Sequence, residues 1–170
     1  MGNFEINAEL GDNEKGIKNY QIFVNTINKV RNYYISHLGE DFMNKLDLYV
    51  DNATRDSGYT PVTISVLKKY VIIKLGITSD YSEESIAYQF AHELMHFVFH
   101  AKYGLDRKSN VDQEEAICSA ASLVYIYKVY PKAFEDCNKH VRNLENASYR
   151  QGANIAKDID YNFEELLKLV

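Results

Sequence analysis

The stretch FAHELMHFVFHAKYG, residues 90–104, constrains the fold of this chain more than any other segment. Histidines recur every four residues, and the residues between them are almost all apolar. Because residues four apart share one face of an α-helix, the pattern predicts a helix with Ser82 or Asp80 as its N-cap and with its end at Tyr103, before Gly104. A helix that is apolar nearly all round lies inside a fold. The polar side chains on it therefore need partners that offset their loss of hydration.

His92, Glu93 and His96 form the pattern H-E-x-x-H, which predicts a metal site. The two histidines can direct imidazole nitrogens at one ion. Glu93 lies about 100° around the helix from His92, where it can reach a water molecule beside that ion, so we expect it to act as a general base. His100 lies two helical turns, about 12 Å, from His92, which is too far to share the ion. We expect His100 to cap the helix end or to form hydrogen bonds there.

A catalytic zinc ion takes three protein ligands and a water molecule, so a third ligand must lie outside this segment. Glu114 and Glu115 follow His96 by 18 and 19 residues, at the start of a second predicted helix, 111–130. The loop LDRKSN leaves room for the chain to reverse, so that an antiparallel second helix would return a carboxylate to the site. An acidic residue in a first helical turn is also favoured by the helix dipole, and one of the pair is expected to serve only that purpose.

The two predicted helices resemble those of the ImmA/IrrE-type metallopeptidases, which are small gluzincins. The similarity rests on A-H-E-L-x-H at 91–96 and on E-A-x-x-x-A-A at 115–121. It implies zinc as the cofactor and Glu115, rather than Glu114, as the third ligand. Met95 and Ile117 depart from the family's usual Gly and Asn, which leaves the subfamily and the substrate open.

The same resemblance covers the apolar segment just before the first helix. In gluzincins the strand at this position lies beside the substrate, which makes residues 71–77 the expected contact for an extended peptide. Val71, Ile73 and Leu75 are the expected contact residues.

These features predict zinc-dependent hydrolysis of peptide bonds, with Glu93 accepting a proton from the attacking water. By analogy with the family, we expect selective cleavage of one protein partner, such as a regulator. A tyrosine or histidine should stabilise the oxyanion, and His140 and Tyr149 are candidates.

Two other functions remain open. One is a regulatory or interaction domain without activity, in which zinc only stabilises the fold. The other is a different zinc hydrolase, such as a deformylase, but that class needs a cysteine ligand before the motif, and Cys118 and Cys137 both follow it.

The remaining segments predict an α+β fold in one domain, 1–170. Apolar residues at helical spacing predict a helix over 16–38, and helical patterns return over 132–145 and 155–169. VTISVL and YVIIKLGI predict two antiparallel strands joined by Lys68 and Lys69. We expect a small antiparallel sheet followed by a helical half that carries the HExxH helix and the glutamate-ligand helix. This arrangement would be similar to that of the minigluzincins, as the family resemblance implies.

The composition excludes several partners. With 19 basic and 24 acidic residues the net charge is -5, which disfavours binding to nucleic acid. Neither a secretory signal nor a stretch long enough to cross a bilayer is evident, so we expect a cytoplasmic protein without membrane contact. The expected partner is a peptide or protein substrate, and the sequence does not indicate an oligomeric state.

Overall fold

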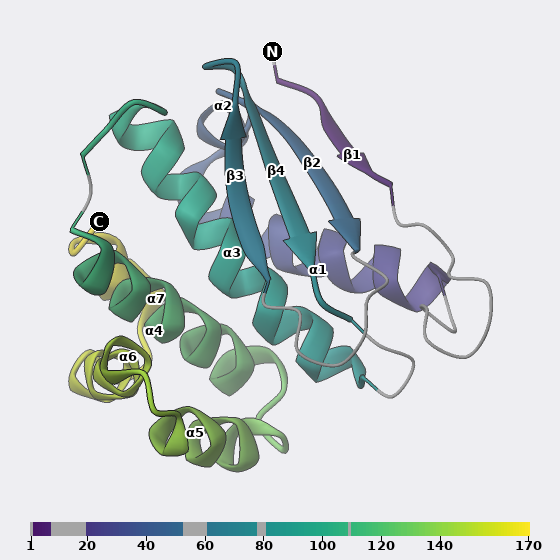
Figure 1. Ribbon diagram of the computed structural model, residues 1–170. Helices are drawn as coiled ribbons and strands as arrows, with labels where there is room; N and C mark the ends of the chain where they lie inside the picture. The colour runs from purple at the N-terminus through teal and green to yellow at the C-terminus, as the bar shows by residue number, and fades with distance from the viewer. Residues whose placement is uncertain (1, 8–19, 53–60, 78–80, 109) are drawn as a thin grey trace.

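The computed structural model describes residues 2–7, 20–52, 61–77, 81–108 and 110–170. Its fold is α+β, with one four-stranded sheet and a larger helical part, as shown in Figure 1. In chain order the elements are β1 (Phe4–Ile6), α1 (Tyr20–Leu38), α2 (Glu40–Met43), β2 (Asp47–Asn52), β3 (Val62–Val66), β4 (Tyr70–Leu75), α3 (Glu83–Tyr103), α4 (Val111–Val129), α5 (Phe134–Asn143), α6 (Ala147–Asp158) and α7 (Phe163–Leu167). The first four residues of the predicted helix 16–38, and Asp80, lie outside the described residues.

The sheet is mixed, with strand order β1-β2-β4-β3. The predicted hairpin is confirmed, because β3 and β4 pair antiparallel. Its turn has Leu67 and Lys68 at its centre, both with positive φ, as a type I′ turn requires. The expectation of an antiparallel sheet is wrong for the other pairs, since β1–β2 and β2–β4 are parallel. Alternating apolar residues mark a half-buried strand but do not show which way its neighbour runs.

One face of the sheet forms the core with the helices. Leu48 and Val50 on β2 pair with Val71 and Ile73 on β4, and all four side chains are buried. Helix α3 packs against β3 and β4, and α1 packs against α3. Thr63 on β3 pairs with Ile73, so its side chain shares the face that α3 covers. This register brings an edge strand within reach of the HExxH residues.

Helix α3 lies between the sheet and the helical part of the molecule (Figure 1). The Ser82 hydroxyl accepts a hydrogen bond from the Ser85 N–H at its start, and Gly104, with φ 87°, follows its last residue. The predicted helix is therefore confirmed at both ends. Eleven of its residues are buried, including His92 and Glu93. Within the described ranges no helix is long and apolar enough to cross a lipid bilayer.

Helix α4 is the centre of the helical part and contacts α3, α5, α6 and α7. Helix α6 approaches it closely at Gly152, where an added Cβ would lie 2.5 Å from Ser119 Cβ and 2.6 Å from the Ala116 carbonyl oxygen. The prediction of one helical run over 155–169 is wrong, because α6 ends at Asp158 and α7 begins at Phe163. Asp160 and Tyr161, which lie between the two helices, both have positive φ, so the helix cannot continue through them. The apolar residues keep their helical spacing across this break, and the sequence pattern therefore does not reveal it.

Candidate metal centre

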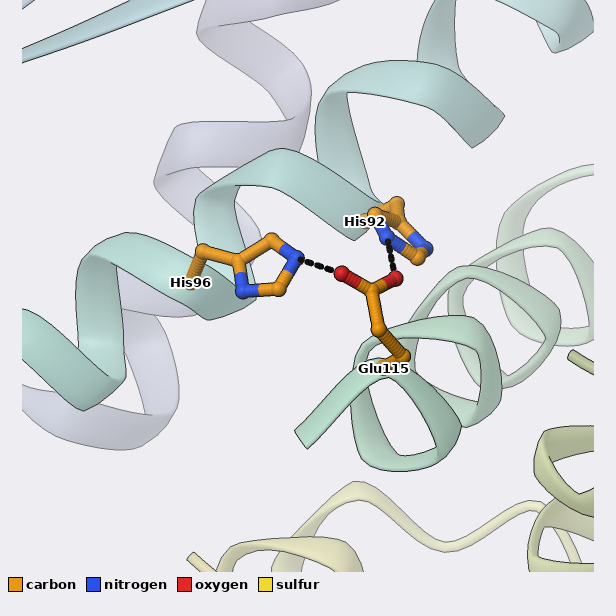
Figure 2. Close-up of side chains that lie close together, drawn as sticks. All are labelled: His92, His96 and Glu115. Atoms are coloured by element: carbon orange, nitrogen blue, oxygen red, sulfur yellow. Dashed lines mark hydrogen bonds and ion pairs between the residues drawn. The ribbon is translucent and has the colours of Figure 1, made fainter. Parts of the chain in front are cut away.

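Two antiparallel helices bring the predicted ligands together. His92 and His96 lie one turn apart on α3, and Glu115 reaches between them from the first part of α4 (Figure 2). His92 Nε2 is 3.2 Å from Glu115 Oε2, and His96 Nε2 is 3.3 Å from Glu115 Oε1. One possible ligand atom from each residue lies within 4.8 Å of the other two. Within the described part of the chain, this is the group of His, Cys, Asp and Glu residues that could hold a metal ion.

The donor atoms fit a small tetrahedral cation. Two imidazole nitrogens and one carboxylate form the ligand set of many catalytic zinc sites. Atoms bound about 2.0 to 2.1 Å from such an ion lie roughly 3.3 Å from one another. Each imidazole nitrogen lies at about this spacing from one Glu115 oxygen, at 3.2 and 3.3 Å, and the three ligand atoms lie within 4.8 Å of one another. The three residues could therefore bind a metal ion.

Glu114 has a different position from Glu115. Its Oε1 is 2.7 Å from His96 Nδ1, on the side of the ring that faces away from Glu115. The Arg107 guanidinium donates hydrogen bonds to both Glu114 carboxylate oxygens. A carboxylate that accepts from Nδ1 fixes the ring orientation and leaves Nε2 free to bind a cation. The geometry thus places Glu115, rather than Glu114, in the group that could bind a metal ion, and it places Glu114 against the far nitrogen of His96.

Charges in the site favour ionised carboxylates. Burial acts to raise the pKa of Glu115, but its hydrogen bonds and charge interactions with His92 and His96 hold that pKa far below its usual value. The pKa of Glu114 is likewise held at about 2, against burial, by His96 and Arg107. Burial lowers the pKa of His96, whereas Cys118 and the two glutamates raise it by a larger amount. A cation would therefore meet deprotonated carboxylates and displace a proton from the His96 imidazole.

Glu93 is held by the edge strand. The Thr63 hydroxyl lies 2.7 Å from Glu93 Oε2, to which it donates, and 3.1 Å from the Glu93 backbone oxygen. Glu93 is only 4% exposed and does not belong to the ligand group. Sequence reasoning missed Thr63, which is one of two polar residues, with Ser65, in the otherwise apolar run VTISVL. Its role depends on which face of β3 meets α3.

A cleft of about 870 Å³ opens beside His92 and Glu93. Both predicted oxyanion candidates, His140 on α5 and Tyr149 on α6, line it. The Tyr149 ring stacks on the His92 ring, with the centroids 5.4 Å apart and the planes 12° from parallel. Burial and the nearby charges of Glu115 and Glu93 raise the pKa of Tyr149 to about 12. Its hydroxyl therefore remains a hydrogen-bond donor at neutral pH.

The expected substrate contacts on β4 need correction. Val71, Ile73 and Leu75 are all 0% exposed, and β4 is paired on both edges, with β2 and with β3. These side chains form core, and the strand has no free edge for a peptide. The strand that directly precedes the HExxH helix in the sequence lies inside the sheet, because β3, which comes earlier, occupies the edge.

His100 also lies apart from the ligand group, as helix geometry predicted. Its backbone oxygen accepts from the Gly104 N–H at the helix end. Its Nδ1 is buried and has no hydrogen-bond partner among the described residues. The same is true of His92 Nδ1, so among the described residues a positioning carboxylate supports only His96 of the two candidate histidine ligands.

Comparison of the chain with protein-family models, curated proteins and solved structures finds no match. The case for a function therefore rests on the geometry of this site and on the chemistry of its residues.

Proposed function

We propose that this protein is a zinc-dependent metallopeptidase that cleaves a protein partner at selected sites. One observation carries the proposal: the ligand atoms of His92, His96 and Glu115 converge, and the carboxylate of the adjacent Glu93 lies at the wall of an open cleft. A site that only stabilised the fold would not need this carboxylate. The motif's resemblance to small gluzincins supports the same reaction class.

The ligand set supports zinc as the ion. When bound, zinc would supply Lewis acidity to a water molecule and to the substrate carbonyl. Glu114 keeps the His96 ring in the orientation that presents Nε2 to the ion, and Arg107 holds Glu114 in turn. These buried contacts preorganise the site before substrate arrives.

Glu93 acts as the general base in this proposal. It accepts a proton from the attacking water and passes it to the departing amine nitrogen. The Thr63 hydroxyl restrains one carboxylate oxygen, so that the other is left for proton transfer. Tyr149, which stays protonated near neutral pH, donates a hydrogen bond to the carbonyl oxygen as it gains negative charge.

Strand β3 supports selection of an extended peptide. It is an edge strand of the sheet, and Pro61 just before it lines the cleft. A peptide could add to this edge through main-chain hydrogen bonds and place its scissile bond near Glu93. The moderate volume of this cleft suits cleavage of few sites better than general digestion.

The test compares wild-type protein with Glu93→Gln. We expect both to bind one zinc ion per chain by metal analysis, and only the wild type to cleave peptides from a proteome-derived library read by mass spectrometry. Zinc binding without cleavage by the wild type would instead support a domain in which the metal only stabilises the fold. Cleavage by both proteins would refute Glu93 as the base.

A further inference from the structure

The charged side chains that line the cleft are of one sign. Glu93 lies on α3, Asp136 on α5 and Glu145 between α5 and α6. Among the described lining residues there is no lysine or arginine. The guanidinium of Arg150, which does not line the cleft, donates to the backbone oxygens of Leu144 and Glu145 at 2.6 and 2.7 Å. The walls of the cleft therefore carry carboxylates that no lining lysine or arginine neutralises.

Three tyrosine rings, Tyr81, Tyr88 and Tyr149, line the same cleft. The Tyr88 hydroxyl oxygen is buried and has no hydrogen-bond partner among the described residues. A buried polar group without a partner is unfavourable in a folded protein, and a bound ligand is one way of satisfying it. Ring faces attract cations, and a hydroxyl oxygen can accept a hydrogen bond from one.

A lysine or arginine side chain has the chemistry that this lining recognises. Its charged end is attracted by Asp136 and Glu145 and by the tyrosine rings. Its apolar stem can lie along Pro61 and Leu144, which also line the cleft. An acidic side chain would be repelled. A neutral apolar side chain would gain only the contacts with the tyrosine rings, Pro61 and Leu144.

We propose that the cleft selects peptides with a lysine or arginine beside the scissile bond. This inference names the substrate class of the site and rests on the proposed peptidase function. Asp136 and Glu145 are exposed, so that each should contribute modestly and in a salt-dependent way. Together with the rings we expect a preference on the order of tenfold for lysine over a neutral side chain of similar length.

The test measures binding separately from cleavage. The zinc-loaded Glu93→Gln variant is titrated against fluorescent peptides that are identical except for one central lysine, norleucine or glutamate. By anisotropy, the lysine peptide should bind about tenfold more tightly than the norleucine peptide, and the glutamate peptide should bind most weakly. Adding Asp136→Asn and Glu145→Gln should bring the lysine-to-norleucine ratio towards one. As a matched control, Glu135→Gln changes a neighbour of Asp136 on α5 that does not line the cleft, and it should preserve the lysine-to-norleucine ratio.

Each outcome bears on the inference. Equal binding of lysine and norleucine peptides, no measurable binding of the lysine peptide, or a preference that survives the double change would overturn it. Cleavage of the same peptides by wild-type protein separates the two claims. If the wild type cleaves the norleucine peptide as fast as the lysine peptide, the peptidase proposal stands and this inference fails. If it cleaves none while the binding preference is present, the peptidase proposal fails and the cationic site stands.

Discussion

Replacing Glu115 by Gln should abolish tight zinc binding, whereas the same change at Glu114 should only weaken it. Glu115 places one carboxylate oxygen near each ligand histidine, so the amide removes a charged ligand from the ion. Of the two histidines, Glu114 contacts only His96, at the ring nitrogen that faces away from Glu115. Loss of such an outer partner costs about 10- to 100-fold in metal affinity, or roughly 1.4 to 2.7 kcal/mol. The two neighbouring residues thus give effects of different size.

Stability has to be separated from affinity in the Glu114 variant. The Glu114 and Arg107 side chains are 8% and 11% exposed, so that removing one charge leaves the other buried and unpaired. We expect a loss of about 3 kcal/mol in the free energy of unfolding, near the lower end for a buried pair, because Gln can still accept a hydrogen bond. The double change Glu114→Gln and Arg107→Gln removes both charges. It should recover stability but keep the reduced zinc affinity.

Competition with a chromophoric zinc chelator measures the affinity, and thermal unfolding with and without zinc gives an independent reading. Free zinc at 100 times its dissociation constant should stabilise the wild type by about 2.7 kcal/mol, and it should not stabilise Glu115→Gln. Equal losses of affinity in the two single variants, or wild-type affinity in Glu115→Gln, would refute the assignment of the third ligand.

Three other changes test the packing, the charges and the base. Gly152→Ala should lower the free energy of unfolding by about 1 to 3 kcal/mol, because its methyl group would meet α4 at 2.5 Å; an unchanged melting temperature would show that α6 moves away freely. Glu83→Gln should lower the free energy of unfolding by about 1 kcal/mol near pH 7. Hydrogen bonds from Lys29 and from the Tyr130 hydroxyl lower the pKa of the Glu83 carboxyl in this partly exposed site, and the amide loses this charge. That stability is present above the unfolded-state pKa and is lost as the pH falls through the folded-state pKa, so urea unfolding should show the variant and wild type converging in acid; a gap that persists there would contradict the linkage. Thr63→Val should reduce kcat on the order of tenfold with zinc content unchanged, since Glu93 loses its restraining hydroxyl; wild-type kcat would exclude a positioning role.

Much of the metal centre could be read from local spacing. Residues four apart on a helix share a face whatever surrounds them, so the pairing of His92 with His96 and the exclusion of His100 followed from helix geometry alone. The ends of α3 followed from Ser82 and Gly104, which act on the backbone beside them. That a carboxylate of the next helix returns to the site also followed, because the short loop lets α4 run back along α3.

The long-range contacts could not be read in this way. The choice between Glu114 and Glu115 depends on the rotation of α4 about its axis relative to α3. Only the packed structure showed Glu114 at the far side of the His96 ring and Glu115 between the two histidines. Strand order likewise decided that β4 is internal and that Thr63, on β3, reaches Glu93. Side-chain periodicity depends on neighbours along the chain and therefore determined the helices and the face that carries the candidate metal ligands. Strand direction, strand order and helix rotation depend on how distant surfaces pack together, so only the tertiary structure decided the cleft and the residues that line it.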